Sequence, residues 1–143
     1  MRSMGRGGWA DTIGLRYAAR INGFDTIALT KLDVLDTCET VKVCVGYRYR
    51  GEVLTDFPEE ERIWREAEPV YEEMSGWQTG THGLRDYAEL PAKAREYLDR
   101  LSELIGVPFS IISTGAARTD TILVEDSALA RWFPALRGLL PAV

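Results

Sequence analysis

Histidine and cysteine are scarce in this sequence, whose 143 residues include one His and two Cys. Cys38 and Cys44 fit no metal-ligand spacing, so we expect two free thiols in a reducing, cytoplasmic setting and neither a disulfide nor a zinc site. His82 stands in a loop-like stretch rich in Gly and Thr, where a structural role is expected. The sequence therefore predicts no metal site and no catalytic residue of its own.

Long apolar runs and an excess of basic residues are also missing. No run approaches the roughly 18 apolar residues that a membrane helix needs, so no membrane partner is expected. The net charge of −5 argues against nucleic acid, because a phosphate-binding surface normally leaves a basic balance. The glycine-rich start, residues 1–8, has no apolar segment of the kind found in signal peptides, and we expect a flexible edge there.

What the sequence does contain is a succession of patterns that predicts an α/β fold: a partial, mostly parallel sheet with an antiparallel hairpin and flanking helices. The first helix has Asp11 as its expected N-cap and Gly23 just after its end. Its apolar stripe is Ile13, Tyr17 and Ile21. Helices are expected over 9–21, near 59–64 and over 90–105, and strands over 25–30, 40–50, 52–54, 68–74, 108–112 and 119–124.

The strand expected over 40–50 alternates strictly between apolar and polar residues, so its apolar side chains are predicted to share one face. These are Val41, Val43, Val45, Tyr47 and Tyr49.

Polar residues follow two of the apolar strands at once. Residues 31–33 come directly after the strand over 25–30, and residues 113–115 come after the strand over 108–112. In open α/β sheets, ligands bind at the carboxyl ends of the strands, so both loops lie at one edge if these strands are parallel neighbours. The predicted site residues are Lys31, Leu32, Asp33, Ser113, Thr114 and Gly115.

The chemistry of these loops suits a guanine base. A carboxylate is a pure acceptor, so Asp33 can take both the N1–H and the exocyclic amine of guanine as a bidentate pair. Adenine lacks this donor pair, and a buried carboxylate left unpaired would cost several kcal/mol, which makes such a site selective. The stem of Lys31 can cover the base face, and backbone N–H groups near Gly115 can reach the purine O6.

Three long strings then point to a family. "GFDTIALTKLDVLDTCETVKVCVGYRYRG", "EPVYEEMSGW" and "LPAKAREYLDRLSELIGVPFSIISTGAARTDTILV" resemble, in this order, the C-terminal third of adenylosuccinate synthetase. The resemblance covers residues 9–124, which we expect to form one domain between the flexible edge 1–8 and a helical tail over 125–143. That tail helix would begin after Asp126, with its stripe at Leu129, Trp132, Phe133 and Leu136.

The resemblance implies a function in purine synthesis. The family joins aspartate to IMP, using GTP and magnesium, and its full-length members are homodimers in the cytoplasm. By resemblance, residues 31–33 and 113–115 are the guanine-binding segments, and Arg6 falls on one of the arginines that grip the aspartate substrate and the ribose. The sequence departs from the family at Gly5, where another arginine is usual, and at Ala116 and Ala117, where proline and an acidic residue are usual.

The residues that carry the family's catalysis are not found. The sequence has no phosphate-binding Gly-x-x-x-x-Gly-Lys-Ser/Thr string, and the resemblance places the catalytic Asp and His and the magnesium ligands outside this chain. We therefore expect a guanine-recognising portion that is inactive by itself and binds guanine nucleotides weakly. Two alternatives stay open: a non-enzymatic structural or assembly module with the same fold, and a subunit completed by a separate chain that carries the phosphate loop.

Overall fold

The computed structural model describes residues 8–124, 127, 131 and 132. Arg6, the expected flexible edge before Gly8 and nearly all of the expected tail helix lie outside these residues. The boundaries of the expected domain and tail therefore stay predictions. Within the described residues, no helix is long and apolar enough to cross a membrane.

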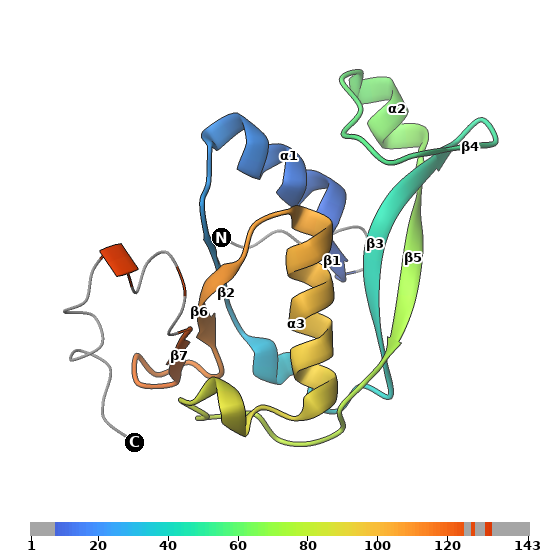
Figure 1. Cartoon of the computed structure of the whole chain (residues 1–143). Helices are drawn as coiled ribbons and strands as arrows, with labels where there is room; N and C mark the ends of the chain where they lie inside the picture. Colours follow the sequence, from blue (N-terminus) through green and yellow to red (C-terminus); the bar gives the residue numbers. More distant parts are fainter. Residues whose placement is uncertain (1–7, 125–126, 128–130, 133–143) are drawn as a thin grey trace.

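The first of two sheets is built around β3 (Thr40–Tyr49) (Figure 1). It pairs in parallel with β1 (Ala10–Asp11) and antiparallel with both β4 (Glu52–Leu54) and β5 (Glu68–Ser75). The β3–β4 connection is a tight hairpin whose Gly51 has a φ of 81°. The hairpin and the return strand were both expected from the sequence, and both are confirmed.

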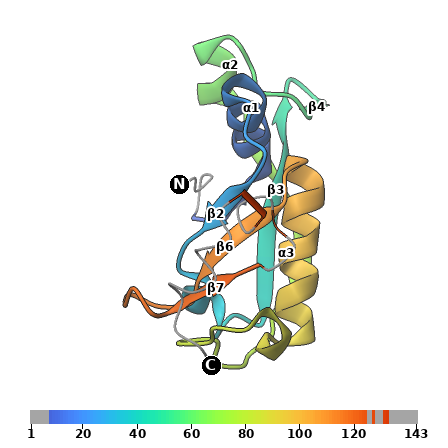
Figure 2. The same cartoon turned by 60° about the vertical axis from the view of Figure 1, so that its left-hand side comes forward.

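The second sheet lies on the other side of the molecule and contains the strands that precede both predicted loops. β2 (Ile27–Leu29) and β6 (Phe109–Ser113) are parallel neighbours, and β7 (Thr121–Leu123) pairs antiparallel with β6. Figures 1 and 2 show β2 and β6 side by side in both orientations. The α/β class is thus confirmed, with the described strands divided between two sheets that each hold one parallel pair. Both sheets are mixed and not mostly parallel, because the other three pairings among the described strands are antiparallel.

The N-terminal helix is fixed by its caps. α1 runs over Thr12–Asn22, and Oδ1 of Asp11 accepts hydrogen bonds from the N–H groups of Ile13 and Gly14, at 3.1 and 3.2 Å. Gly23 ends the helix in the left-handed conformation with a φ of 64°. Both caps agree with the sequence prediction, but the predicted stripe is wrong beyond its first residue, because Tyr17 and Ile21 are exposed.

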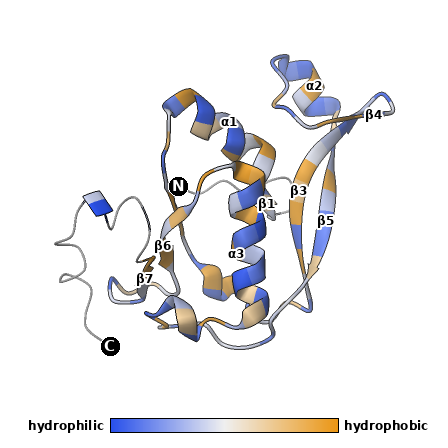
Figure 3. Ribbon diagram, in the orientation of Figure 1, coloured by the Kyte–Doolittle hydropathy of each residue, from blue (hydrophilic) through white to orange (hydrophobic). Residues whose placement is uncertain are grey.

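The long helix α3 (Ala92–Ile105) joins the two sheets into one core. It lies along one side of them (Figure 2) and buries Ala94, Tyr97, Leu98, Leu101 and Ile105. The same cluster holds Val41 and Val43 from the first sheet and Phe109, Ile112 and Ile122 from the second. Figure 3 shows hydrophobic and hydrophilic residues alternating along α3, as expected for a helix with one buried side.

A bulge in β3 changes which face its side chains occupy. The pairing with β5 shifts register between Cys44 and Gly46, so Tyr47 comes to the same face as Cys44, away from the main core. They join a second buried cluster with Ile13 from α1 and Ala67, the residue that follows α2 (Glu61–Glu66). The prediction that Tyr47 shares a face with Val41 is therefore wrong.

Candidate functional site

The parallel pairing of β2 with β6 brings the two predicted loops to one edge. Ile27 lies opposite Phe109 and Leu29 lies opposite Ile112, so both strands run out at the same end of the sheet. Residues 30–33 leave β2 there, and residues 114–115 leave β6. The two strands are therefore parallel neighbours, as a shared site for both loops requires.

The first loop turns sharply at Lys31. This residue has a φ of 59°, a left-handed conformation that is uncommon for a residue other than glycine, and it leads into the short 3₁₀ helix η1 (Leu32–Leu35). Leu32 is 1% exposed and fixes the turn to the core. Asp33 follows in the first turn, so its position is set by a buried neighbour on one side and by the helix on the other.

The carboxylate of Asp33 is only partly satisfied. Its side chain is 25% exposed, and among the described residues its Oδ1 is buried without a hydrogen-bond partner. Its Oδ2 lies 3.7 Å from Nδ1 of His82, which is beyond hydrogen-bond distance. Buried polar atoms almost always have partners, and an unpaired one costs about 1–3 kcal/mol. The site therefore has spare acceptor capacity that a ligand with two donors would use.

The second loop is held by its own hydrogen bonds. The Thr114 N–H donates to the Asp120 carbonyl at 2.8 Å, and the Ser113 hydroxyl donates to the Gly115 carbonyl at 2.8 Å. Gly115 leaves room for two neighbouring side chains, because a Cβ on it would collide with the carboxylate of Asp120 and lie 2.8 Å from Cε1 of His82, so both would have to shift. Since the Thr114 N–H is already bonded, Gly115 remains as the backbone donor that the sequence argument needs.

A third segment, residues 77–84, lies against both loops and was not predicted from the sequence. Asp36, the residue after η1, accepts hydrogen bonds from Trp77 Nε1, Thr81 N and Thr81 Oγ1, each at 2.7 Å. On the other side, the Gly83 N–H donates to the Thr114 carbonyl at 3.4 Å. No local sequence pattern predicts these contacts, because Trp77 and Thr81 are 41 and 45 residues from Asp36 in the sequence.

His82 projects from this third segment into the space between the two loops. Its imidazole approaches Asp33 on one side and Gly115 on the other. The ring is 70% exposed, so water reaches it directly. The position agrees with the expectation of a loop residue, but the contact with Asp33 brings His82 into the candidate site.

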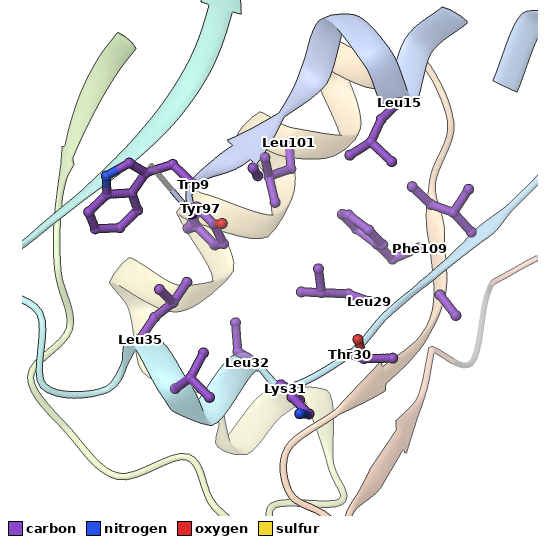
Figure 4. A pocket seen from close by; sticks show the side chains of 15 residues that line it. Trp9, Leu15, Leu29, Thr30, Lys31, Leu32, Leu35, Tyr97, Leu101 and Phe109 are labelled. Carbon is purple, nitrogen blue, oxygen red and sulfur yellow. The ribbon is translucent and has the colours of Figure 1, made fainter. Parts of the chain in front are cut away.

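An apolar pocket of about 340 Å³ adjoins the first loop. Figure 4 shows its wall built from Trp9, Leu15, Leu29, Tyr97, Leu101 and Phe109, with Thr30 and Lys31 at the end of β2. The pocket lies between β1 and β2. Within the described residues, β1 pairs only with β3 and β2 only with β6, so each leaves one strand edge unpaired beside the pocket.

Other titratable groups are buried away from the loops and stabilise the fold. The Tyr47 hydroxyl donates to Oδ2 of Asp11 at 2.7 Å, and burial together with this bond raises the pKa of Tyr47. Burial also raises the pKa of the Cys44 thiol. Neither Cys44 nor Cys38 forms a disulfide. Among the described residues, no three His, Cys, Asp or Glu side chains are grouped to hold a metal ion.

Comparison with known proteins identifies relatives. Residues 2–122 match the sequence family described as adenylosuccinate synthetase. The adenylosuccinate synthetase of Coxiella burnetii (strain Dugway 5J108-111) is 51% identical over 118 residues, which are 82% of this chain and 27% of that protein. That of Pelotomaculum thermopropionicum is 47% identical over 121 residues, which are 85% of this chain and 28% of that protein.

A solved structure agrees with these matches. The structure of fully ligated adenylosuccinate synthetase from Plasmodium falciparum superposes with a TM-score of 0.76 at 37% identity. The match covers 82% of this chain and 28% of that one. The chain thus spans less than a third of the length of the relatives that it matches.

Proposed function

Because the chain belongs to the adenylosuccinate synthetase family, we propose that it is the guanine-recognising C-terminal portion of that enzyme and is inactive by itself. The base of GTP would lie between residues 31–33 and residues 113–115. The observation that carries this proposal is the buried Oδ1 of Asp33, which has no partner among the described residues.

The residues at this edge fit a guanine base. Asp33 would accept from N1–H and from the exocyclic amine, one donor to each oxygen, and the Gly115 N–H would donate to O6. Lys31 is exposed beside them, so its stem can cover one face of the ring while the ammonium stays hydrated. GTP would supply the phosphoryl group for the reaction of the whole enzyme, and this chain's own residues would orient the base.

The role is proposed as recognition and not catalysis. The sequence contains no phosphate-binding glycine-rich string, and phosphoryl transfer depends on groups that position the phosphates and magnesium. Base contacts alone give modest affinity, so binding in the micromolar to millimolar range is the expectation.

Calorimetry with GTP, GMP and ATP, each with and without magnesium, tests the proposal. GTP and GMP should bind with similar affinity whether or not magnesium is present, and ATP should not bind. Asp33→Asn replaces one acceptor by a donor and should weaken GMP binding at least tenfold, which corresponds to about 1.4 kcal/mol. Asp25→Asn, at an exposed position before the same strand, is the matched control and should bind GMP normally.

A folded protein that binds no guanine nucleotide would refute the proposal. That result would leave the structural or assembly module as the function of this chain. Equal loss of binding in both Asn variants would show that Asp33 has no specific role.

We further propose that the apolar pocket between β1 and β2 binds the remainder of the enzyme, in the same polypeptide or in a separate one. Two unpaired strand edges beside an apolar wall suit an added strand, because its backbone would complete the hydrogen bonding and its side chains would fill the pocket. The relatives contain the length of chain for this, since about 28% of their length is matched here.

A matched pair of valines tests this surface. Val34 lines the pocket and is 60% exposed, whereas Val53 is 49% exposed on β4, away from the pocket. Mixed with the unmatched part of a relative as a separate polypeptide, the wild type and Val53→Glu should co-elute with it on size exclusion, and Val34→Glu should not. If the chain alone forms a homodimer and Val34→Glu dissociates it, the pocket joins two copies of the chain instead.

A further inference from the structure

The imidazole of His82 occupies the space in which the proposed guanine base would bind. Its Nδ1 lies 3.7 Å from Oδ2 of Asp33, and its Cε1 lies 2.8 Å from the point where a Cβ on Gly115 would stand. The ring therefore fills the space between the Asp33 carboxylate and Gly115. In the proposed function, Asp33 accepts from N1–H and the exocyclic amine of guanine, and the Gly115 N–H donates to O6. A base cannot enter this space while the ring stays there.

The burial of Asp33 supports the same reading. Its Oδ1 is buried although it has no partner among the described residues, so a ligand reaches it only after a covering group moves. His82 contacts the same carboxylate and is 70% exposed. An exposed ring can rotate into solvent at little cost, whereas Leu32, on the other side of Asp33, is 1% exposed and fixed in the core.

The backbone that carries His82 is held on both sides, so the side chain alone has to move. Thr81 donates two hydrogen bonds of 2.7 Å to Asp36. The Gly83 N–H donates to the Thr114 carbonyl, and the Thr114 hydroxyl donates to the Leu84 carbonyl at 2.8 Å. The segment is thus a fixed support from which the imidazole reaches Asp33.

We propose that His82 covers the guanine site: its imidazole lies over Asp33 when no base is bound and must be displaced by the two donors of the guanine edge. This inference rests on the proposed function of the site. An imidazole offers the carboxylate one N–H at long range, whereas guanine offers two donors at hydrogen-bond distance, so the exchange favours the base. The covered state lowers the affinity of every base that uses Asp33 by one common factor.

The common factor is what calorimetry can measure. His82→Ala should raise the affinity for GMP about two- to fivefold, the range that a contact of up to about 1 kcal/mol between an exposed ring and a carboxylate allows. It should raise the affinity for IMP, which lacks the exocyclic amine, by the same factor. Thr79→Ala, an exposed change in the same segment, is the control and should leave both affinities unchanged. Weaker binding by His82→Ala, or unequal factors for GMP and IMP, would overturn the proposal, because either would mean that His82 contacts the bound base.

A second measurement does not depend on nucleotide affinity. His82 is the only histidine of the sequence, so its imidazole C–H signals in an NMR spectrum are unambiguous. A nuclear Overhauser effect between the imidazole and the Gly115 Hα should be present in the free protein and should disappear at saturating GMP. Its absence in the free protein, or its persistence with GMP bound, would overturn the inference even if GMP binds as proposed. If the effect is present but no variant binds GMP, the proposed function fails, and the covering role fails with it.

Discussion

Replacing Asp36 by Ala should destabilise the protein by about 3 kcal/mol, because this one carboxylate holds the third segment of the site. It accepts three hydrogen bonds of 2.7 Å from Trp77 and Thr81, which are 6% and 0% exposed, so their donors would be left without partners in a nearly dry environment. A hydrogen bond to a charged group contributes about 1.5–3 kcal/mol. Asp36 itself is half-buried, and water can replace part of each bond, so about 1 kcal/mol for each is the appropriate figure.

Urea denaturation followed by circular dichroism measures this loss, which should lower the melting temperature by roughly 10 °C. Asp25→Ala removes an exposed carboxylate and should change the free energy of unfolding by less than about 0.5 kcal/mol. Asp36→Asn keeps one acceptor oxygen and should fall between the two. A cost below about 1 kcal/mol for Asp36→Ala would refute the view that the segment is fastened at this point.

Three further results are expected. Asp11→Ala removes the N-cap of α1 and leaves the buried Tyr47 hydroxyl without its acceptor, so urea denaturation should show a loss of about 3 kcal/mol in unfolding free energy. Tyr47→Phe should restore part of this loss in the double variant, and full additivity of the two changes would contradict the coupling. Gly115→Ala should cost about 1–3 kcal/mol and abolish GMP binding in calorimetry, because its Cβ overlaps neighbouring side chains; unchanged binding would contradict it. Burial raises the pKa of Tyr97 to about 12, above the value of about 10 for an unfolded chain, so its neutral phenol contributes fully below about pH 10 and loses that contribution as the pH rises to 12. Tyr97→Phe should therefore flatten the fall in unfolding free energy between pH 10 and 12, and an equally steep fall would show that another group is responsible.

The local signals in the sequence were sufficient for the parts of the fold that short-range chemistry controls. Asp11 and Gly23 cap α1 as their side-chain acceptor and permissive backbone predict. Gly106 ends α3 with a φ of 81° for the same reason. The sequence predicts the two polar loops at one edge if strands 25–30 and 108–112 are parallel neighbours, and the parallel pairing of Ile27 with Phe109 meets that condition.

Features that depend on distant partners were not predicted. Nothing near Asp36 in the sequence indicates that it will bind Trp77 and Thr81, since the contacts form only when residues 77–84 fold back over η1. The bulge at Cys44 is similarly invisible, because strict alternation in the sequence says nothing about an extra residue in the ladder. Tyr17 lies on the predicted stripe of α1 but stacks on Phe57 near the surface, with ring centroids 4.5 Å apart.

The position of α3 has a consequence for how the molecule opens. Within the described residues, the two sheets share no ladder of hydrogen bonds. A common hydrophobic cluster connects them, and α3 contributes Ala94, Tyr97, Leu98, Leu101 and Ile105 to it. Loss of α3 would expose apolar side chains of both sheets to water, so neither sheet should persist as a separate folding unit. Amide hydrogens in the middle of β3 and of β6 should consequently exchange with solvent at a shared, slow rate set by the undocking of a single helix.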